Sequence, residues 1–142
     1  MVDNLSPEHR HRCMARIRTK DTDLERAVRS SLFRRGLRFR KHVRTLPGKP
    51  DVVFPRARVA VFVDGDFWHG YQFRHWENGL SEFWRRKIRV NRERDLHNFL
   101  ALRAMGWRVV RVWQHEVEDD LEECTGRIVR AIAESRASHG LP

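Results

Sequence analysis

The sequence has little of what marks a secreted or membrane-bound protein. Cys13 and Cys124 are its only cysteines, too few for a disulfide framework or for a metal site built from thiolates alone. No apolar run is long enough to cross a membrane, no signal peptide opens the chain, and the basic stretches lack an apolar stripe that could lie on lipid. We therefore expect a cytoplasmic protein with free cysteines and no membrane partner.

Acidic residues are also in the minority, and this imbalance points to a polyanionic partner. The 142 residues include 29 Lys and Arg against 19 Asp and Glu, which gives a formal net charge of +10. Basic residues concentrate in residues 10–49 and 85–111, whereas residues 116–123 are acidic. Such asymmetry favours one face that meets phosphate groups, and nucleic acid is the leading candidate. The alternative is a set of arginine-rich helices that are simply solvated.

The pattern of apolar residues predicts one α/β domain at residues 21–136, between a mobile basic arm at 1–20 and a frayed tail at 137–142. The 40% hydrophobic content is enough for a single modest core. Helical periodicity and short β-branched runs predict a small mixed four-stranded sheet flanked by helices. The expected elements are a helix from Thr22 to Gly36, strands at 37–41, 51–54 and 59–63, a long basic helix at 80–105, a strand at 107–113 and a helix at 116–135.

Two aspartates stand where neighbouring strands of that sheet begin and end. Asp51 starts the second strand and Asp64 follows the third. Carboxylates delivered by adjacent strands can hold Mg²⁺, which polarises a phosphoryl oxygen and activates water. His69 lies five residues after Asp64, and an imidazole titrates near neutral pH, so it is a candidate general base. Glu25, on the first helix, would complete an acidic site.

Each of these residues also has a purely structural interpretation. Asp51 follows a proline and could simply begin a strand, and an Asp-Gly pair such as Asp64-Gly65 is a common turn. A single histidine is usually a packing or surface residue, and a single glutamate on a helix is usually solvated. Their combination in a strongly basic chain is what favours a metal-dependent site.

The loop after the third strand contains two large aromatic residues, Phe67 and Trp68, among glycines and polar residues. Apolar side chains wedged between base steps kink a duplex, and the cost is least where base pairing is already flawed. Trp84, at the start of the basic helix, could join them. The alternative is that the three side chains fill a small core beneath the loop.

Five stretches together resemble the very short patch repair endonucleases. They are "RCMARIRTKDTDLERAVRSSLFRRGLRFR", "LPGKPDVVF", "VFVDGDFWHG", "FWRRKIRVNRERD" and "GWRVVRVWQHE", and the resemblance covers residues 8–132. It implies a restriction-endonuclease-like PD-(D/E)xK fold. It also implies Mg²⁺-dependent nicking of one DNA strand, 5′ to the thymine of a T:G mismatch that arises when 5-methylcytosine deaminates. The implied location is the nucleoid, with functional links to a cytosine-5 methyltransferase and to mismatch-repair proteins.

The same resemblance implies roles for individual residues. Asp51 would bind the metal, the backbone carbonyl of Val63 would add a further oxygen ligand, and His69 would act on the attacking water. Glu25 falls on the helix glutamate of the family's site. The residues expected to intercalate are Met14, Phe67, Trp68 and Trp84. Further contacts with DNA are expected from Lys49, Arg85, Lys87 and Asn91.

Two features depart from the family pattern. Asp64 stands where a histidine assists at the metal site, so we expect it to act as a further acid and metal ligand. The family's structural zinc uses cysteines at positions that are Asp66 and Tyr71 here. Asp66, His75 and His115 could make only a weak zinc site, because structural zinc prefers four ligands. The aromatic residues that could hold the loop by packing instead are Tyr71, Phe73 and Trp76.

Two further functions stay open at this point. Target choice rests on a few loop contacts, so a related nuclease that acts on other flawed, modified or invading DNA is one of them. The other is a module that binds distorted duplex DNA without cutting it, which the departures at Asp64 and at the zinc positions favour. In each case we expect a monomer on DNA, because a mismatch is asymmetric.

Overall fold

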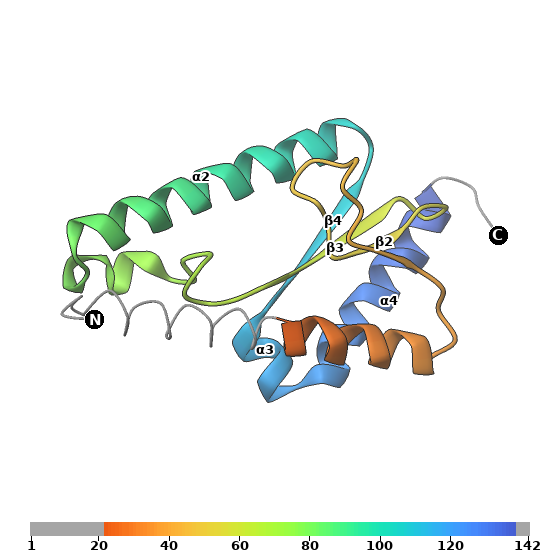
Figure 1. The fold of residues 1–142 in the computed structure, drawn as a ribbon. Helices are drawn as coiled ribbons and strands as arrows, with labels where there is room; N and C mark the ends of the chain where they lie inside the picture. Colours follow the sequence, from red (N-terminus) through yellow and green to blue (C-terminus); the bar gives the residue numbers. More distant parts are fainter. Residues whose placement is uncertain (1–21, 139–142) are drawn as a thin grey trace.

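The computed structural model describes residues 22–138, and it shows the expected mixed α/β fold (Figure 1). The expected arm, including Met14, and residues 139–142 of the expected tail lie outside the described residues. No helix in the described part is long and apolar enough to span a membrane. The elements are a first helix at residues 22–34 (helix 22–34), β1 (Arg40–Lys41), β2 (Val52–Phe54), β3 (Val59–Asp64), the 3-10 helices η1 (Phe73–His75) and η2 (Glu77–Gly79), α2 (Glu82–Ala104), β4 (Arg108–Trp113), α3 (Gln114–Asp119) and α4 (Leu121–Ser138).

The four strands form one mixed sheet in the order β1-β2-β3-β4. β1 and β2 are antiparallel, as are β2 and β3, whereas β3 and β4 run parallel. Parallel neighbours need a long crossover, and α2 lies within this one. β2 ends its pairing at Val52 opposite Val61, while β3 continues to Asp64 beside β4. The last residues of β3 therefore have a strand on one side only.

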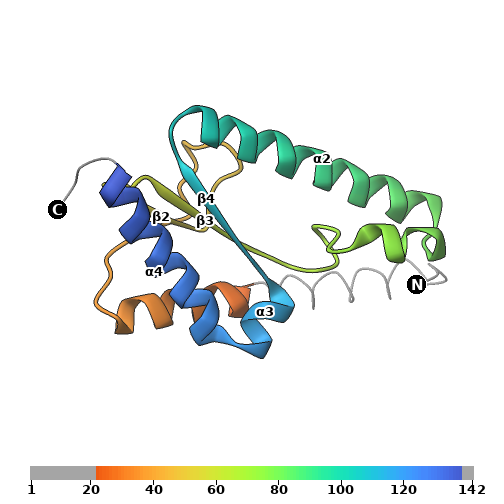
Figure 2. The same ribbon diagram turned by 180° about the vertical axis from the view of Figure 1, so that it is seen from behind.

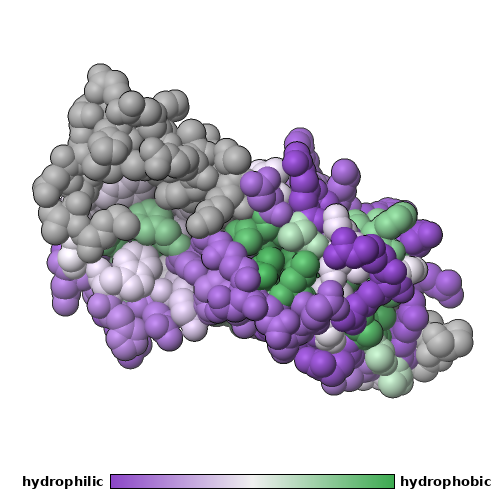
Figure 3. Space-filling view, turned by 90° about the horizontal axis from the view of Figure 1, so that it is seen from below, coloured by the Kyte–Doolittle hydropathy of each residue, from purple (hydrophilic) through white to green (hydrophobic). Residues whose placement is uncertain are grey.

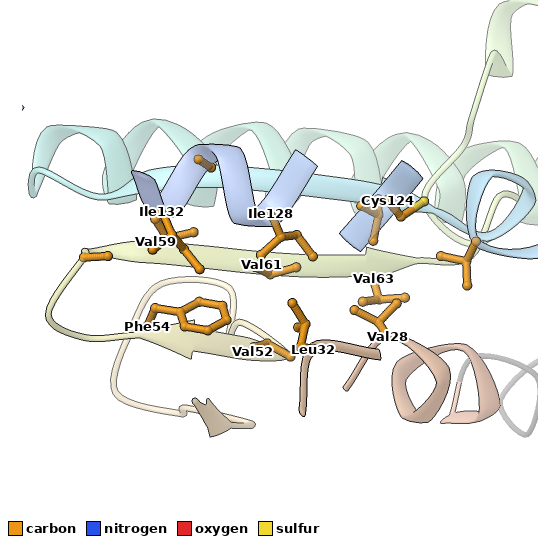
Figure 4. Close-up of a cluster of buried hydrophobic side chains, with 14 of the residues drawn as sticks. Val28, Leu32, Val52, Phe54, Val59, Val61, Val63, Cys124, Ile128 and Ile132 are labelled. Atoms are coloured by element: carbon orange, nitrogen blue, oxygen red, sulfur yellow. The ribbon is translucent and has the colours of Figure 1, made fainter. Parts of the chain in front are cut away.

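Helices cover both faces of the sheet, as the two opposite views show (Figures 1 and 2). On one face, Val52 of β2 and the valines of β3 pack against helix 22–34 and α4 (Figure 4). On the other face, Ala60 and Phe62 pack against Phe99 and Leu102 of α2. Because side chains alternate along a strand, odd-numbered residues of β3 face the first core and even-numbered ones face α2. Asp64 therefore points to the α2 side.

α2 is the longest element, and it packs on two different cores. Its C-terminal half lies against the sheet, as described above. Its N-terminal half extends past the sheet and packs Trp84 and Ile88 against Phe73 and Leu80 of the loop before it. The Ser81 hydroxyl caps the helix by accepting a hydrogen bond from the Trp84 amide. The loop at residues 65–80 is thus fixed between α2 and the end of β3.

Two sequence expectations about elements were wrong. The single helix expected at 116–135 is two helices, because Asp120 adopts a non-helical backbone (φ −156°, ψ 85°) and its carboxylate accepts a hydrogen bond from the Glu123 amide. Asp commonly competes with helical bonding in this way. The first strand contains only Arg40–Lys41 rather than residues 37–41, because His42 turns into the left-handed region (φ 52°) and shortens the pairing with β2.

Hydrophilic residues dominate the described surface in the view from below (Figure 3). Apolar residues form several small patches among them in this view. Several large apolar side chains elsewhere are exposed along α2, including Phe83 and Val90, which alternate with arginines and lysines. This mixture of basic and apolar groups is typical of a surface that meets nucleic acid.

Candidate active site

Asp51 directly precedes β2, at the point beyond which β3 has no strand partner on the β2 side. Its amide donates a hydrogen bond to the Val61 carbonyl (3.0 Å), and its carboxylate accepts one from the Val63 amide (2.7 Å). The side chain thus takes the place of a missing strand partner. Because the amide and the carbonyl of one strand residue point to the same edge, the Val63 carbonyl also faces the Asp51 side. Two hard oxygen ligands are therefore brought together there.

Glu25 reaches the same place from helix 22–34, and it shares a hydrogen bond with Asp51. The pKa of Asp51 is raised from its usual 3.8 to about 8, mainly by burial and in addition by the negative charges of Glu25 and Asp64. The hydrogen bond from Val63 opposes it. Glu25 is itself paired with Arg29 (3.5 Å) and His42 (3.3 Å). Asp51 is thus a buried acid that would ionise readily only beside an added cation.

Asp64 and His69 lie next to this pair. Asp64 is 5% exposed, and burial raises its pKa although His69 and Arg111 oppose the rise. The loop places Nε2 of His69 3.4 Å from Asp64 Oδ1. Gly70 makes this turn possible, because it has φ +69° and a Cβ there would approach Ile88 to 2.8 Å. All four acids and bases expected from the sequence are therefore gathered at one site.

Asp95 is a member of the site that the sequence reasoning missed. Its carboxylate lies 2.6 Å from Nδ1 of His69. Burial alone would lower the pKa of His69, but this hydrogen bond and the charges of Asp64 and Asp95 raise it. The buried face of α2 includes Ile88, Asn91 and Asp95 at helical spacing. An acidic residue at a position that helical periodicity predicts to be buried was the sequence feature that could have identified Asp95.

Arg111, on β4, is the second residue that was missed. Its Nε lies 2.7 Å from Asp64, and its terminal nitrogen lies 2.8 Å from Asp95. The guanidinium is stacked over the rings of Trp113 and Phe99, at 4.0 and 5.0 Å from their centroids. Asp64, His69 and Asp95 also form a group whose ligand atoms all lie within 4.8 Å of one another, close enough to hold a metal ion. Among the described residues, no other group of three acids, histidines or cysteines does so.

A cavity of about 420 Å³ opens onto these groups. Its lining includes the acids Glu25, Asp51 and Asp64 together with His69. The basic and amide side chains that also line it are those of Lys49, Arg94 and Asn98. The cavity thus combines oxygen ligands for a cation, a base and donors for a phosphate group, which is the chemistry that phosphodiester hydrolysis requires.

The three aromatic residues expected to intercalate form a cluster beside this cavity. Phe67 and Trp68 are half-buried and lie edge-on to Trp84, with ring centroids 5.5 and 5.9 Å away. Trp84 is only 6% exposed. Phe67 also stacks on Trp76 at 5.8 Å. In the protein without DNA, these side chains therefore form the small core that was the alternative interpretation, and inserting Trp84 into a duplex would require unpacking it.

Some of the residues expected to contact DNA make hydrogen bonds within the protein, whereas others are exposed. Arg85 donates hydrogen bonds to the carbonyls of Glu77 and Leu80, and Asn91 donates one to the carbonyl of Trp68. Both therefore hold the loop in place. Lys87, in contrast, is exposed and lies over the Trp68 ring at 5.7 Å.

The three residues considered for zinc are not brought together. His115 Nδ1 lies 2.9 Å from Asp66, but His75 is exposed on η1 and does not complete a group of three ligands with them. Tyr71 instead packs on His115 and Trp113, with centroids 4.3 and 5.0 Å apart. Aromatic packing and a hydrogen bond thus connect the loop to the end of β4.

Comparisons with known proteins place the chain among DNA endonucleases. The family model for the DNA mismatch endonuclease Vsr matches residues 2–77. The type II nicking enzyme V.XorIIP of Xanthomonas oryzae pv. oryzae is 49% identical over 121 residues, which cover 84% of this chain and 89% of that protein. The type II nicking enzyme V.NmeDIP of Neisseria meningitidis is 37% identical, covering 95% and 93%. The DNA mismatch endonuclease Vsr of Escherichia coli is 37% identical, covering 80% and 74%.

Proposed function

This chain belongs to the Vsr family of DNA mismatch endonucleases, and from this premise we infer that it nicks one strand of duplex DNA 5′ to the thymine of a T:G mismatch. Its relatives are named as nicking enzymes and as a mismatch endonuclease, which supports a DNA-nicking endonuclease. The observation that carries the proposal is the cavity in which Asp51, Glu25, Asp64 and His69 meet.

We further propose that the cofactor is Mg²⁺. The fit rests on Asp51, because in the described part of the chain no basic side chain is paired with this buried carboxyl, whose pKa is raised to about 8. Asp51 and the Val63 carbonyl would hold the cation, with Glu25 and Asp64 beside them, and oxygen ligands of this kind suit Mg²⁺. Bound there, Mg²⁺ would stabilise negative charge on the phosphoryl oxygens.

His69 is the proposed general base. When Nδ1 carries the ring proton and donates a hydrogen bond to Asp95, Nε2 is left to accept a proton from the attacking water. Asp95 fixes the ring and stabilises the imidazolium that forms. Lys49 and Arg94, which line the same cavity, would bind the phosphate being cut.

Recognition of the mismatch is assigned to the aromatic cluster and to the basic surface around it. Phe67 and Trp68 are partly exposed beside the cavity, so they are placed to enter a weakened base pair. Trp84 would support them from below, and Met14 would enter from the arm. We propose that the protein acts as a monomer on DNA in the cytoplasmic nucleoid, with functional links to a cytosine-5 methyltransferase, whose product deaminates to give T:G, and to mismatch-repair proteins.

The test is a comparison of substrates. The purified chain, with Mg²⁺, is incubated with duplexes that each contain one mismatch, with T:G placed in several flanking sequences, and with a matched duplex. Nicking confined to T:G, and lost in Asp51→Ala, would support the proposal. Cutting of many flawed duplexes would favour the broader nuclease, and tight binding without any cutting would favour the binding module.

A further inference from the structure

Arg111 has an unusual setting for a basic residue, because its guanidinium bonds two acids of the site from behind, while its side chain lines the neighbouring cavity rather than the one that contains Asp51. Val110 and Val112 face the core on one side of the sheet, so Arg111 points to the other side, where α2 lies. Asp64 points the same way from the neighbouring strand, and Asp95 reaches the same point from α2. Three different elements therefore meet at this guanidinium.

The contacts of Arg111 are part of a closed ring of four titratable or charged groups. Arg111 bonds Asp64 at 2.7 Å and Asp95 at 2.8 Å. His69 lies between the same two acids, with Nδ1 2.6 Å from Asp95 and Nε2 3.4 Å from Asp64. The rings of Trp113 and Phe99 hold the guanidinium plane in position. Each of the two acids is thus already compensated by a neighbouring positive or protonatable group.

Asp51, on the other side of the site, lacks such compensation among the described residues. Asp51 has one hydrogen bond from the Val63 amide and faces the carboxyl of Glu25. Glu25 pairs with His42 and Arg29, but at the longer distances of 3.3 and 3.5 Å. A divalent cation placed at Asp51 would meet uncompensated oxygen ligands. The same cation placed between Asp64, His69 and Asp95 would meet the fixed positive charge of Arg111.

We propose that Arg111 is a built-in cation that takes the place of a second metal ion, so that the site binds a single divalent cation at Asp51. The guanidinium also holds the Asp95 carboxylate in the position from which it reaches His69. Arg111 is therefore a positioning residue: it acts through the two aspartates and not on the DNA. This inference rests on the proposed nuclease function, because it assigns the metal content of that same site.

The experiment counts bound metal ions without DNA. Mn²⁺ is titrated into the full chain, and bound ions per chain are measured by calorimetry and by the loss of the free-ion electron paramagnetic resonance signal. We expect one Mn²⁺ for the parent and none at that site for Asp51→Asn. Arg111→Met should bind a second Mn²⁺ and nick DNA at least tenfold more slowly. Arg111→Lys, which keeps the charge, should bind one.

A matched control comes from the same strand. Arg108 also lies on β4, but it pairs with Glu134 of α4 away from the cavity, so Arg108→Met should keep one Mn²⁺ and the parental nicking rate. Two bound Mn²⁺ in the parent would overturn the proposal, and this result does not depend on the folding of any variant. One Mn²⁺ in a folded Arg111→Met would also overturn it. A parent that binds one Mn²⁺ but does not nick DNA would instead reject the proposed function.

Discussion

Replacing Asp51 with asparagine should stabilise the metal-free protein while it removes nicking. The pKa of Asp51 is raised to about 8, so this carboxyl is protonated in the folded protein at pH 7. The same carboxyl in the unfolded chain is ionised above its usual pKa of 3.8. Folding at neutral pH must therefore take up a proton, which costs free energy. Asparagine has the shape of the protonated acid and pays no such cost.

The size of the stability change follows from the difference between the working pH and the pKa of Asp51 in the unfolded chain. The stabilising contribution of Asp51 is complete below its unfolded pKa and is lost as the pH rises towards about 8. From pH 3.8 to pH 7, at about 1.36 kcal/mol per pH unit, the cost is roughly 4 kcal/mol. Relaxation of the site will reduce it, so we expect a gain of about 2–4 kcal/mol for Asp51→Asn at pH 7. This corresponds to roughly 6–12 °C in Tm.

The assay is thermal unfolding of parent and variant in EDTA between pH 4.5 and 8. The difference in Tm should be small at the acidic end and should grow as the pH rises. Asp119→Asn neutralises an exposed acid on α3 and should show no such growth. Mg²⁺ should raise the Tm of the parent, more so at high pH, and should not raise that of Asp51→Asn. A variant no more stable than the parent at pH 7.5 would refute the reasoning.

Three other predictions concern orientation, packing and charge. Asp95→Asn should lower kcat for nicking by roughly 10²-fold or more with little change in KM, because His69 loses its orienting acid, whereas the exposed Glu93→Gln on the same helix should not. Trp84→Ala should lower the free energy of unfolding by about 3–5 kcal/mol, because the Trp84 side chain is only 6% exposed. The neighbouring Phe83 is 56% exposed, so Phe83→Ala should lower the Tm much less, and equal losses of Tm in the two variants would contradict this prediction. Affinity for DNA should fall steeply with salt, and Lys87→Ala should reduce the slope of log affinity against log salt by about one; an affinity that is flat with salt would count against the basic interface.

Those site residues that lie in or close to predicted strands could be placed from the sequence. The β-branched runs predicted β2 and β3, and the positions of Asp51 and Asp64 at adjacent strand ends predicted that they would meet. His69 follows Asp64 closely, so a tight loop was enough to bring it to the same site. These inferences needed only strand geometry and a short loop.

Asp95 and Arg111 could not be predicted, because their roles depend on how α2 packs across β4. They lie 16 positions apart in the sequence, and Arg111 is 47 positions from Asp64. A basic residue in a strand of a basic protein looks like part of the surface until its partners are known. The aromatic residues illustrate a different limit. Composition allowed Trp84 to be a wedge or a core residue, and only its burial separates the two for the protein without DNA.

The most direct test of the account is a single-turnover reaction on a duplex with one T:G mismatch and a different label on each strand. We expect one cut, in the thymine strand and 5′ to that thymine, in the presence of Mg²⁺. Neither the matched duplex nor the Asp51→Ala variant should give this product. Cutting of both strands, equal cutting of the matched duplex, or no cutting by a folded parent would contradict it.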